Sequence, residues 1–468
     1  MKFSVVFLPF LLFAGVNIQK GHVGVSYDYL TLPQNEKMGL LGSSYLYDFK
    51  YGYLGVGVYS AVAGKRGGFF TGGLEFGSKF HIYNNFYSNF GGFIGGGGGG
   101  SAPQGGGLML RGYMGVLYHL SKIDIGLAYS KIKFPNGDID SNQISLQANI
   151  PFKTIFVTKP IDLELLKKLD IGWQSTYISM IAQKYLPYNS TTTSNKTQKS
   201  FSVIGIEYGK EIQDNIFYYI EASGAAQGDS DGYAEIVNGI KYCYKNLYIK
   251  AGIGASGGGK VDTAGGAITK VAVGIESKNK VSLFADVGNI SSIEGHFHAL
   301  SLKAGIDYKT DVLSFNYNKP FHSNFEMKKW EIEVFNQTYL QNLKNEKINL
   351  IGFKLKDYFT KNNYISGTAL GAYKGESGGY AVGLFGIGHK IDINNFNISL
   401  EGALGCAGGG GIDVGGGFVY KGLIGFGYDI DNFGLKIDIG KTKAFSGALD
   451  SNLISFGIVY NFNTLEGL

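Results

Sequence analysis

The sequence is short of charged residues and of proline. Charged residues make up 17% of the 468 positions and there are only 8 prolines, whereas an ordinary soluble domain has about a quarter of its residues charged. A surface with so few charges does not suit a soluble protein. The formal net charge is only +5, and its basic residues are scattered along the chain, so nucleic acid is not an expected partner.

The sequence also lacks a long apolar run. Beyond the N-terminus no segment offers about 18 consecutive apolar residues, which excludes helical membrane spans. The apolar stretch Phe3–Ala14 follows Lys2 and has the length of a secretory h-region, so we predict a signal peptide at residues 1–20 and export of the chain. Only two cysteines are present, Cys243 and Cys406. An oxidising compartment would permit a disulfide between them.

No arrangement of residues points to catalysis. The seven histidines are scattered, and none recurs beside a serine or an aspartate as a hydrolytic site would require. His296 and His298 lack a third metal ligand, and Asp229-Ser230-Asp231-Gly232 lacks the later acidic ligands of a calcium loop. We therefore expect no enzymatic activity, no metal and no cofactor.

What the sequence has in abundance is glycine and aromatic residues, with Gly 73, Tyr 32 and Phe 33. A double glycine cluster occurs three times. Its copies are Gly95–Gly100 with Gly105–Gly107, Gly257–Gly259 with Gly265–Gly266, and Gly408–Gly411 with Gly415–Gly417. Strands are expected on both sides of each cluster, which excludes a phosphate-binding fingerprint, because that needs a following helix.

The chain around each glycine cluster recurs as well. A polar turn and an alternating segment precede it, and a strand with one basic residue, Arg111, Lys270 or Lys421, follows it. This indicates three repeats of about 140 residues. The first and third copies share Asp140-Ser141-Asn142 and Asp450-Ser451-Asn452. We place β repeat units at residues 21–152, 169–309 and 329–468, joined by connectors at 153–168 and 310–328. The first connector includes a possible short helix, Ile161–Leu169.

Within each repeat, segments of about 9 to 14 residues alternate apolar with small or polar residues, which is typical of β-strands. In the last segment Ile454, Phe456 and Ile458 lie on one face, and Ser455 and Gly457 on the other. The alternation predicts about eight strands per unit. In the first unit they are expected near 22–30, 38–49, 51–62, 69–82, 86–95, 107–119, 123–134 and 142–152.

The connections between the expected strands alternate in length. Those after even-numbered strands are short and polar, as in Asn84-Asn85, whereas those after odd-numbered strands are longer and carry the glycine clusters. This pattern is typical of a transmembrane β-barrel with short periplasmic turns and long outer loops. Such parity puts Cys243 and Cys406 at opposite rims, so we expect two free thiols.

The chain resembles the outer-membrane β-barrel proteins of Gram-negative bacteria, through its signal-like start, its about 24 alternating strands and a last strand ending on Val459-Tyr460-Asn461-Phe462. The resemblance implies an all-β, antiparallel up-and-down barrel in the cell outer membrane. It also implies contact with outer-membrane lipid, lipopolysaccharide and the outer-membrane assembly machinery. The oligomeric state is left open.

Two architectures fit the repeats. One is a single barrel of about 24 strands with a wide, wet lumen, which precedent favours. The other is three tandem eight-stranded barrels, whose interiors are narrow enough for side chains to fill.

Charged residues expected on the inward faces are the candidate site: Arg111, Lys270, Asp286, Glu401, Lys421 and Asp438. Either they form a ring that selects permeating ions, or they are internal ion pairs that plug narrow barrels. The first alternative predicts a porin-like channel for small solutes or ions. The second predicts a structural or adhesin-like surface-interaction protein with filled barrels and no open pore.

Overall fold

The computed structural model describes residues 16–157, 163–340 and 347–467. Residues 1–15 of the predicted signal peptide lie outside the described residues, and β1 already begins at Val16, within the predicted segment. Signal cleavage therefore stays a prediction. No helix in the described ranges is long and apolar enough to cross a membrane.

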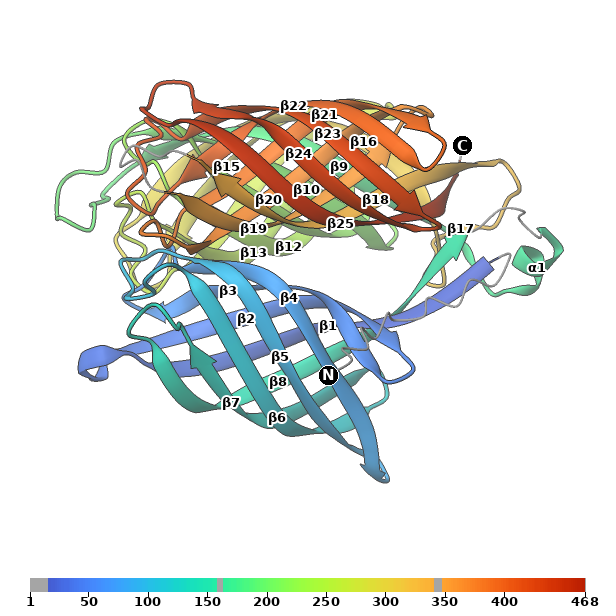
Figure 1. The fold of residues 1–468 in the computed structure, drawn as a ribbon, viewed down its shortest axis with the longest axis horizontal. Coiled ribbons are helices and arrows are strands. Elements are labelled where there is room, and N and C mark those ends of the chain that lie inside the picture. Colours follow the sequence, from blue (N-terminus) through green and yellow to red (C-terminus); the bar gives the residue numbers. More distant parts are fainter. Residues whose placement is uncertain (1–15, 158–162, 341–346, 468) are drawn as a thin grey trace.

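The first eight strands form a closed antiparallel barrel, called barrel 1 (blue and cyan in Figure 1). Its last strand pairs with its first, with Val23 opposite Ile150. The strands are β1 (Val16–Thr31), β2 (Lys37–Phe49), β3 (Gly52–Gly64), β4 (Phe70–Tyr83), β5 (Phe86–Gly98), β6 (Leu108–Leu120), β7 (Ile123–Lys133) and β8 (Asp140–Val157).

Barrel 2 is formed by the next eight strands. Here β16 pairs with β9 along its length, with Leu302 opposite Lys184. The strands are β9 (Gly172–Pro187), β10 (Phe201–Gln213), β11 (Ile216–Gln227), β12 (Ala234–Tyr244), β13 (Leu247–Gly257), β14 (Ala267–Glu276), β15 (Val281–Ser292) and β16 (His298–Ser314).

Barrel 3 closes in the same way, because β25 pairs with β18, with Val459 opposite Glu333. The strands are β18 (Phe325–Tyr339), β19 (Ile348–Tyr358), β20 (Asn363–Lys374), β21 (Ala381–Ile393), β22 (Phe396–Gly408), β23 (Phe418–Ile430), β24 (Phe433–Ala444) and β25 (Asp450–Gly467). Barrels 2 and 3 share one hydrogen-bonded network, because the end of β16 also pairs with β25 through Asp311 and Val312.

The strand pairing does not form the favoured single barrel of about 24 strands. Each group of eight strands satisfies its own edges, since β1 meets β8, β9 meets β16 and β18 meets β25. A closed ring leaves no unpaired strand edge in a lipid environment. The pairing thus agrees with the alternative of eight-stranded barrels.

The connectors are shorter than the sequence pattern suggested, because the closing strands run further. Strand β8 continues to Val157 and β16 to Ser314, and β18 begins at Phe325. Between barrels 1 and 2 lies the short helix α1 (Leu163–Lys168), inside the predicted helical segment, whose first residues are not described. The second connector contains only the two-residue strand β17 (Lys319–Pro320).

Side chains alternate between the two faces of each strand as predicted. On β25 the side chain of Ile458 is 55% exposed, whereas the neighbouring Val459 is 3% exposed and faces the barrel interior. The exposed outward positions of all three barrels are mostly Ile, Leu, Val, Phe and Tyr. Apolar residues outside and polar residues inside are the arrangement of a barrel in lipid.

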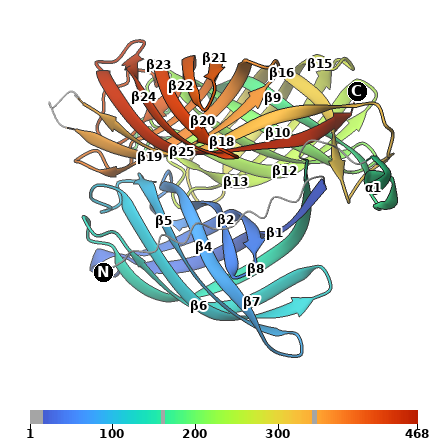
Figure 2. The same cartoon turned by 45° about the vertical axis from the view of Figure 1, so that its right-hand side comes forward.

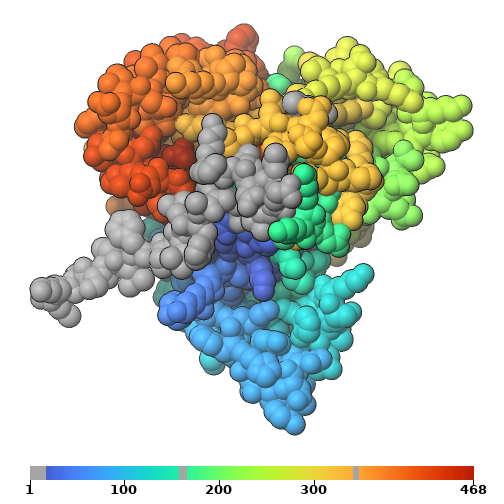
Figure 3. Space-filling view, turned by 90° about the vertical axis from the view of Figure 1, so that its right-hand side faces the viewer, coloured from blue at the N-terminus to red at the C-terminus, as the bar shows by residue number. Residues whose placement is uncertain are grey.

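The barrels lie around a common axis as three lobes (Figure 3), and barrel 1 lies below barrels 2 and 3 in Figure 2. At the loop end a ring of six glycines joins them. Around the ring they follow in the order Gly68, Gly258, Gly232, Gly409, Gly379 and Gly99. All six have a left-handed backbone, with φ between 83° for Gly232 and 115° for Gly99, a conformation that glycine adopts without steric cost.

Contacts around this glycine ring alternate between and within barrels. A Cβ on Gly68 would lie 2.2 Å from the backbone nitrogen of Gly258 in barrel 2, and one on Gly258 would lie 2.2 Å from the carbonyl oxygen of Gly232. The pattern repeats from barrel 2 to barrel 3 and from barrel 3 to barrel 1, at Gly409 and Gly99. The glycine clusters found in the sequence therefore let three backbones meet where no side chain would fit.

At the opposite end an apolar cluster joins all three barrels. It contains Ile155 and Val157 of β8, Leu166 of α1, Trp173 of β9 and Leu465 of β25, all buried. Burying such side chains stabilises by about 1.5 to 3 kcal/mol each. The two connectors thus have an apolar core of their own beneath the barrels.

Candidate functional site: the charged barrel interiors

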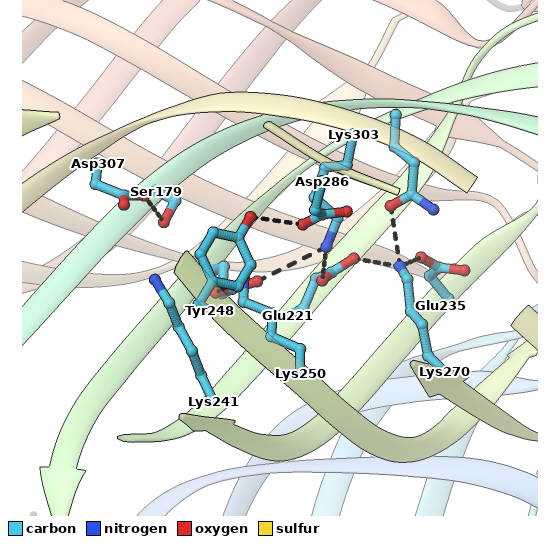
Figure 4. Close-up of polar contacts among 12 residues, drawn as sticks. Ser179, Glu221, Glu235, Lys241, Tyr248, Lys250, Lys270, Asp286, Lys303 and Asp307 are labelled. Carbon is cyan, nitrogen blue, oxygen red and sulfur yellow. Dashed lines mark hydrogen bonds and ion pairs between the residues drawn. The ribbon is translucent and has the colours of Figure 1, made fainter. Parts of the chain in front are cut away.

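Barrel 2 has an interior crowded with ion pairs (Figure 4). The Lys270 Nζ lies 2.6 Å from Glu221 Oε1 and 2.9 Å from Glu235 Oε1, and Lys303 Nζ lies 2.6 Å from Glu221 Oε2. Lys250 pairs in turn with Glu207 at 2.6 Å. Strand alternation places these side chains inside, and every one of them is almost fully buried.

Tyrosines complete the network of barrel 2. Tyr248 donates to Asp286 Oδ2 over 2.8 Å, and Tyr185 donates to Glu235 over 2.7 Å. Buried charges are tolerated only when they are paired and hydrogen-bonded. This barrel meets that condition by placing lysines and carboxylates from facing strands in direct contact.

Barrel 3 is filled in the same manner with different residues. Lys354 Nζ lies 3.0 Å from Glu401 Oε1, Lys436 Nζ lies 2.9 Å from Asp438 Oδ1, and Lys356 forms a close ion pair with Glu331. Further inward charges are Glu333 and Lys390. This interior, too, is a close-packed salt-bridge network.

Barrel 1 has far fewer charges. The Arg111 guanidinium lies 3.1 Å from Asp28 Oδ2 and stacks over Tyr113 at 4.4 Å from the ring centre. Glu75 has no lysine partner within the described part of the chain. It accepts hydrogen bonds from Ser44 and, each over 3.0 Å, from Tyr59 and Tyr113. Hydroxyls therefore replace most of the cations found in the other two barrels.

A cavity of about 20 Å³ lies within barrel 1. Its lining includes Arg111, Glu75, Tyr113, Asn89 and His22. The Nη1 of Arg111 is buried without a hydrogen-bond acceptor. A space of this size holds about one water molecule, and a water there would supply the missing acceptor.

The structure places all six candidate residues inside the barrels. The exposed fraction of each residue ranges from 2% for Asp438 to 4% for Asp286, Glu401 and Lys421. Among the described residues, no hydrogen bond or ion pair joins any two of these six. Lys421 contacts the Gln337 amide oxygen at 2.9 Å and no carboxylate among the described residues.

Several central residues escaped the sequence interpretation. They come from early strands of each unit: Asp28, Glu75, Glu207, Glu221, Glu235, Glu331, Glu333, Lys354 and Lys356. Period-two alternation marks all of them as inward-facing, so that signal was present. The partners were not evident because contacts cross the barrel, as between Arg111 and Asp28, rather than join successive strands.

At the loop rim, one carboxyl group has a pKa that burial raises. Asp231 lies in the β11–β12 loop beside the glycine ring, and its partial burial raises the pKa of the carboxyl group. Among the described residues no group of three or more His, Cys, Asp and Glu side chains could hold a metal ion. His296 contacts Asp262 at 2.8 Å instead of approaching His298 as a second ligand. Both cysteines are free, as predicted.

No family model matches the chain, and no curated protein matches it either. Among solved structures it is similar to Pseudomonas aeruginosa OpdQ, with 8% identity over 96% of this chain and 97% of that one, at a TM-score of 0.25. It is also similar to the outer membrane protein opdK from Pseudomonas aeruginosa, with 8% identity, coverage of 96% and 99%, and a TM-score of 0.24. For Acinetobacter baumannii OccAB3 the identity is 9%, the coverage 96% and 99%, and the TM-score 0.22. At these scores the geometry of the chain itself has to carry the functional argument.

Proposed function

We propose that the chain is an integral outer-membrane β-barrel protein, porin-like in being built of antiparallel barrels with an apolar outer wall. The observation that carries this proposal is the combination of closed strand rings with outward faces of exposed aliphatic and aromatic side chains, such as Ile144 at 63% and Leu283 at 66%. Monomeric soluble proteins rarely expose large contiguous apolar patches. In the hydrocarbon core of a membrane, an apolar outer wall does not have the free-energy cost of exposing apolar side chains to water.

Within this class, we place the channel function in barrel 1. The interiors of barrels 2 and 3 are blocked by direct lysine–carboxylate contacts, such as Lys303 with Glu221. Barrel 1 has the cavity, an unpaired guanidinium nitrogen on Arg111, and a chain of hydroxyls and amides, Tyr53, Asn89 and Gln147. Neutral hydrogen-bonding groups can be replaced by water more readily than ion pairs can be separated. The pathway would admit water and small ions rather than large solutes.

The second candidate function is a structural or surface-interaction role without an open pore. The filled interiors of barrels 2 and 3 favour it, because eight-stranded barrels are commonly occupied by their own side chains. In that case the paired inward charges stabilise the barrels, and the joined loops at the glycine ring form the outer surface.

Single-channel recording of the refolded protein in a planar bilayer distinguishes these functions. The barrel 1 pathway predicts a small conductance, and Arg111→Gln should shift its ion selectivity toward cations because Glu75 and Asp28 then dominate the interior. The matched control is Lys421→Gln, the same strand position in barrel 3, which should leave conductance unchanged. Absence of conductance from a folded protein would support the structural role. A large ohmic conductance would contradict the filled interiors.

A further inference from the structure

The outer walls of barrels 1 and 3 carry matching pairs of lysines near the loop end. On β7 the outward positions Ile125, Leu127 and Tyr129 are followed by Lys131 and Lys133. On β24 the outward positions Leu435, Ile437 and Ile439 are likewise followed by two lysines, Lys441 and Lys443. Each pair therefore stands where an apolar wall gives way to polar residues.

One aspartate serves both lysines of each pair. In barrel 1 Asp140 lies 3.1 Å from Lys131 and 3.4 Å from Lys133, and in barrel 3 Asp450 lies 2.7 Å from Lys441 and 3.6 Å from Lys443. The four lysine side chains are about half exposed, between 46% and 56%. Two lysines and one aspartate leave each patch with one net positive charge on the outside of the barrel.

A gap in the wall lies directly beside each lysine pair. Gly112 is the cross-strand neighbour of Lys131, and Gly422 is the cross-strand neighbour of Lys441. A Cβ atom on either glycine would meet nothing within 4 Å. In barrel 3 the next residue across the sheet, Gly402, is equally open. Bare backbone therefore forms a shallow depression next to the charges.

Barrel 2 lacks both features at the corresponding places. Val271 stands in place of the glycine, and its side chain is 54% exposed. Its cross-strand neighbour is Asn289, in place of the first lysine, and Ser291 follows in place of the second. The lysine pair and the depression are present together in two barrels and absent together from the third, which indicates that they act as one unit.

We propose that each of these two patches binds a phosphorylated lipid of the outer leaflet, with the phosphate held by the lysine pair and an acyl chain lying over the glycine depression. The inference rests on the proposed membrane location of the chain. Lysines at the edge of an apolar band extend their charge into the headgroup region, and each contributes to the attraction of anionic headgroups. The single aspartate fixes the two ammonium groups side by side, in position to contact one phosphate.

Native mass spectrometry of the detergent-solubilised protein with bisphosphorylated lipid A tests the proposal. We expect two lipids per chain, and at least about tenfold weaker binding after K131Q, K133Q, K441Q and K443Q are combined. The charge-matched control combines K122Q, K245Q, K278Q and K280Q, four exposed lysines of the short-turn rim, and should keep both lipids. Equal loss in the two variants would overturn the site.

Two further variants separate the contributions of charge and shape. Gly112→Val with Gly422→Val copies barrel 2, fills the depression and should weaken lipid A binding without changing charge. In barrel 2, His298 stands opposite Ser291, where the other two barrels have the aspartate. Val271→Gly with Asn289→Lys, Ser291→Lys and His298→Asp should therefore create a third bound lipid. Lipid A stripped of its phosphates should bind poorly, and millimolar inorganic phosphate should not displace intact lipid A. Displacement by phosphate would mean that the lysines bind the free anion and that the depression has no role.

Failure of this inference and failure of the proposed function give different results. A chain that migrates as a heat-modifiable barrel after insertion into vesicles but binds no lipid A contradicts only the lipid sites. A chain that does not insert into vesicles contradicts the membrane function itself.

Discussion

Barrel 1 and barrel 2 have the same strand plan but balance their buried charges in different ways. In barrel 2 Lys270 joins two carboxylates, Glu221 and Glu235, so removal of one cation leaves two anions short of a partner. In barrel 1 Glu75 is held by hydroxyls, with Arg111 as the nearby cation. One repeat template can thus be filled either with a network of ions or with a network of neutral hydrogen bonds. The two fillings should respond differently to mutation.

The largest effect is expected from Lys270→Met in barrel 2. Of the hydrogen-bond donors that the described residues supply to Glu235, the hydroxyls of Tyr185 and Tyr233 would remain. A buried carboxylate that loses its cation costs about 3 to 5 kcal/mol. Urea unfolding in lipid vesicles, followed by heat-modifiable migration on gels, measures the loss. Lys199→Met, in an exposed loop pair with Asp229, is the control and should leave stability unchanged. An unaltered unfolding curve for Lys270→Met would show that the ion network contributes nothing.

A smaller loss is expected from Arg111→Met in barrel 1. Asp28 would still accept hydrogen bonds from Ser130 and Gln143, and Glu75 would keep its tyrosines. We expect a loss of about 1.5 to 3 kcal/mol, the range for hydrogen bonds to charged groups. The same unfolding assay measures it. A loss equal to that of Lys270→Met would remove the distinction between the two interiors.

A near-neutral or stabilising effect is expected from Lys421→Met in barrel 3. This lysine contacts an amide oxygen, and replacing a buried ion by an apolar side chain of similar length relieves its desolvation. We expect a change of less than about 1 kcal/mol in the free energy of unfolding. Lys354→Met, which removes the partner of Glu401, serves as the destabilising control. A large loss at Lys421 would reveal a partner that geometry does not identify.

The smallest effect concerns the loop rim, where barrel 2 has Asp231 at the position before its ring glycine and the other barrels have Gly67 and Gly378. Partial burial raises the pKa of Asp231, so the folded state favours the protonated acid. This contribution to stability is present below the unfolded pKa of about 3.9 and is lost as pH rises through the higher folded pKa. Asp231→Asn should therefore be more stable than the parent at pH 7, by a few tenths of a kcal/mol, and equal to it at pH 3. Thermal unfolding at the two pH values checks this. The positive charge of Lys260 lowers the pKa of Asp231, against the effect of burial. A parent that is more stable than Asp231→Asn at pH 7 would mean that this charge has the larger effect.

The sequence was sufficient to predict strands, faces and loop parity, because these depend on local alternation. The eight strands expected in the first unit correspond to β1–β8, and the inward position of Ser455 beside the outward Ile454 is as predicted. Closure is different. Whether β8 pairs with β1 or with β9 depends on edges that are far apart in sequence, and both partners offer similar alternating segments.

Charge partners were harder to predict for the same reason. Lys270 and Asp286 lie on the adjacent strands β14 and β15, yet Lys270 contacts Glu221 across the barrel and Asp286 binds Tyr248. An alternating pattern gives the face of a residue but not its position around the ring. The glycine clusters were recognised as a repeat, whereas their role at the contact of three barrels required knowledge of which loops meet.

The ring formed by Gly68, Gly258, Gly232, Gly409, Gly379 and Gly99 has a consequence for how the protein can change over generations. A trimer of separate, identical barrels would carry every substitution three times, so its interiors would have to change together. Here the three barrels are parts of one polypeptide, so they are always present in 1:1:1 proportion. The contact between them at the glycine ring requires glycine at the six ring positions. One interior is thus free to acquire a new chemistry while its two neighbours preserve the assembly.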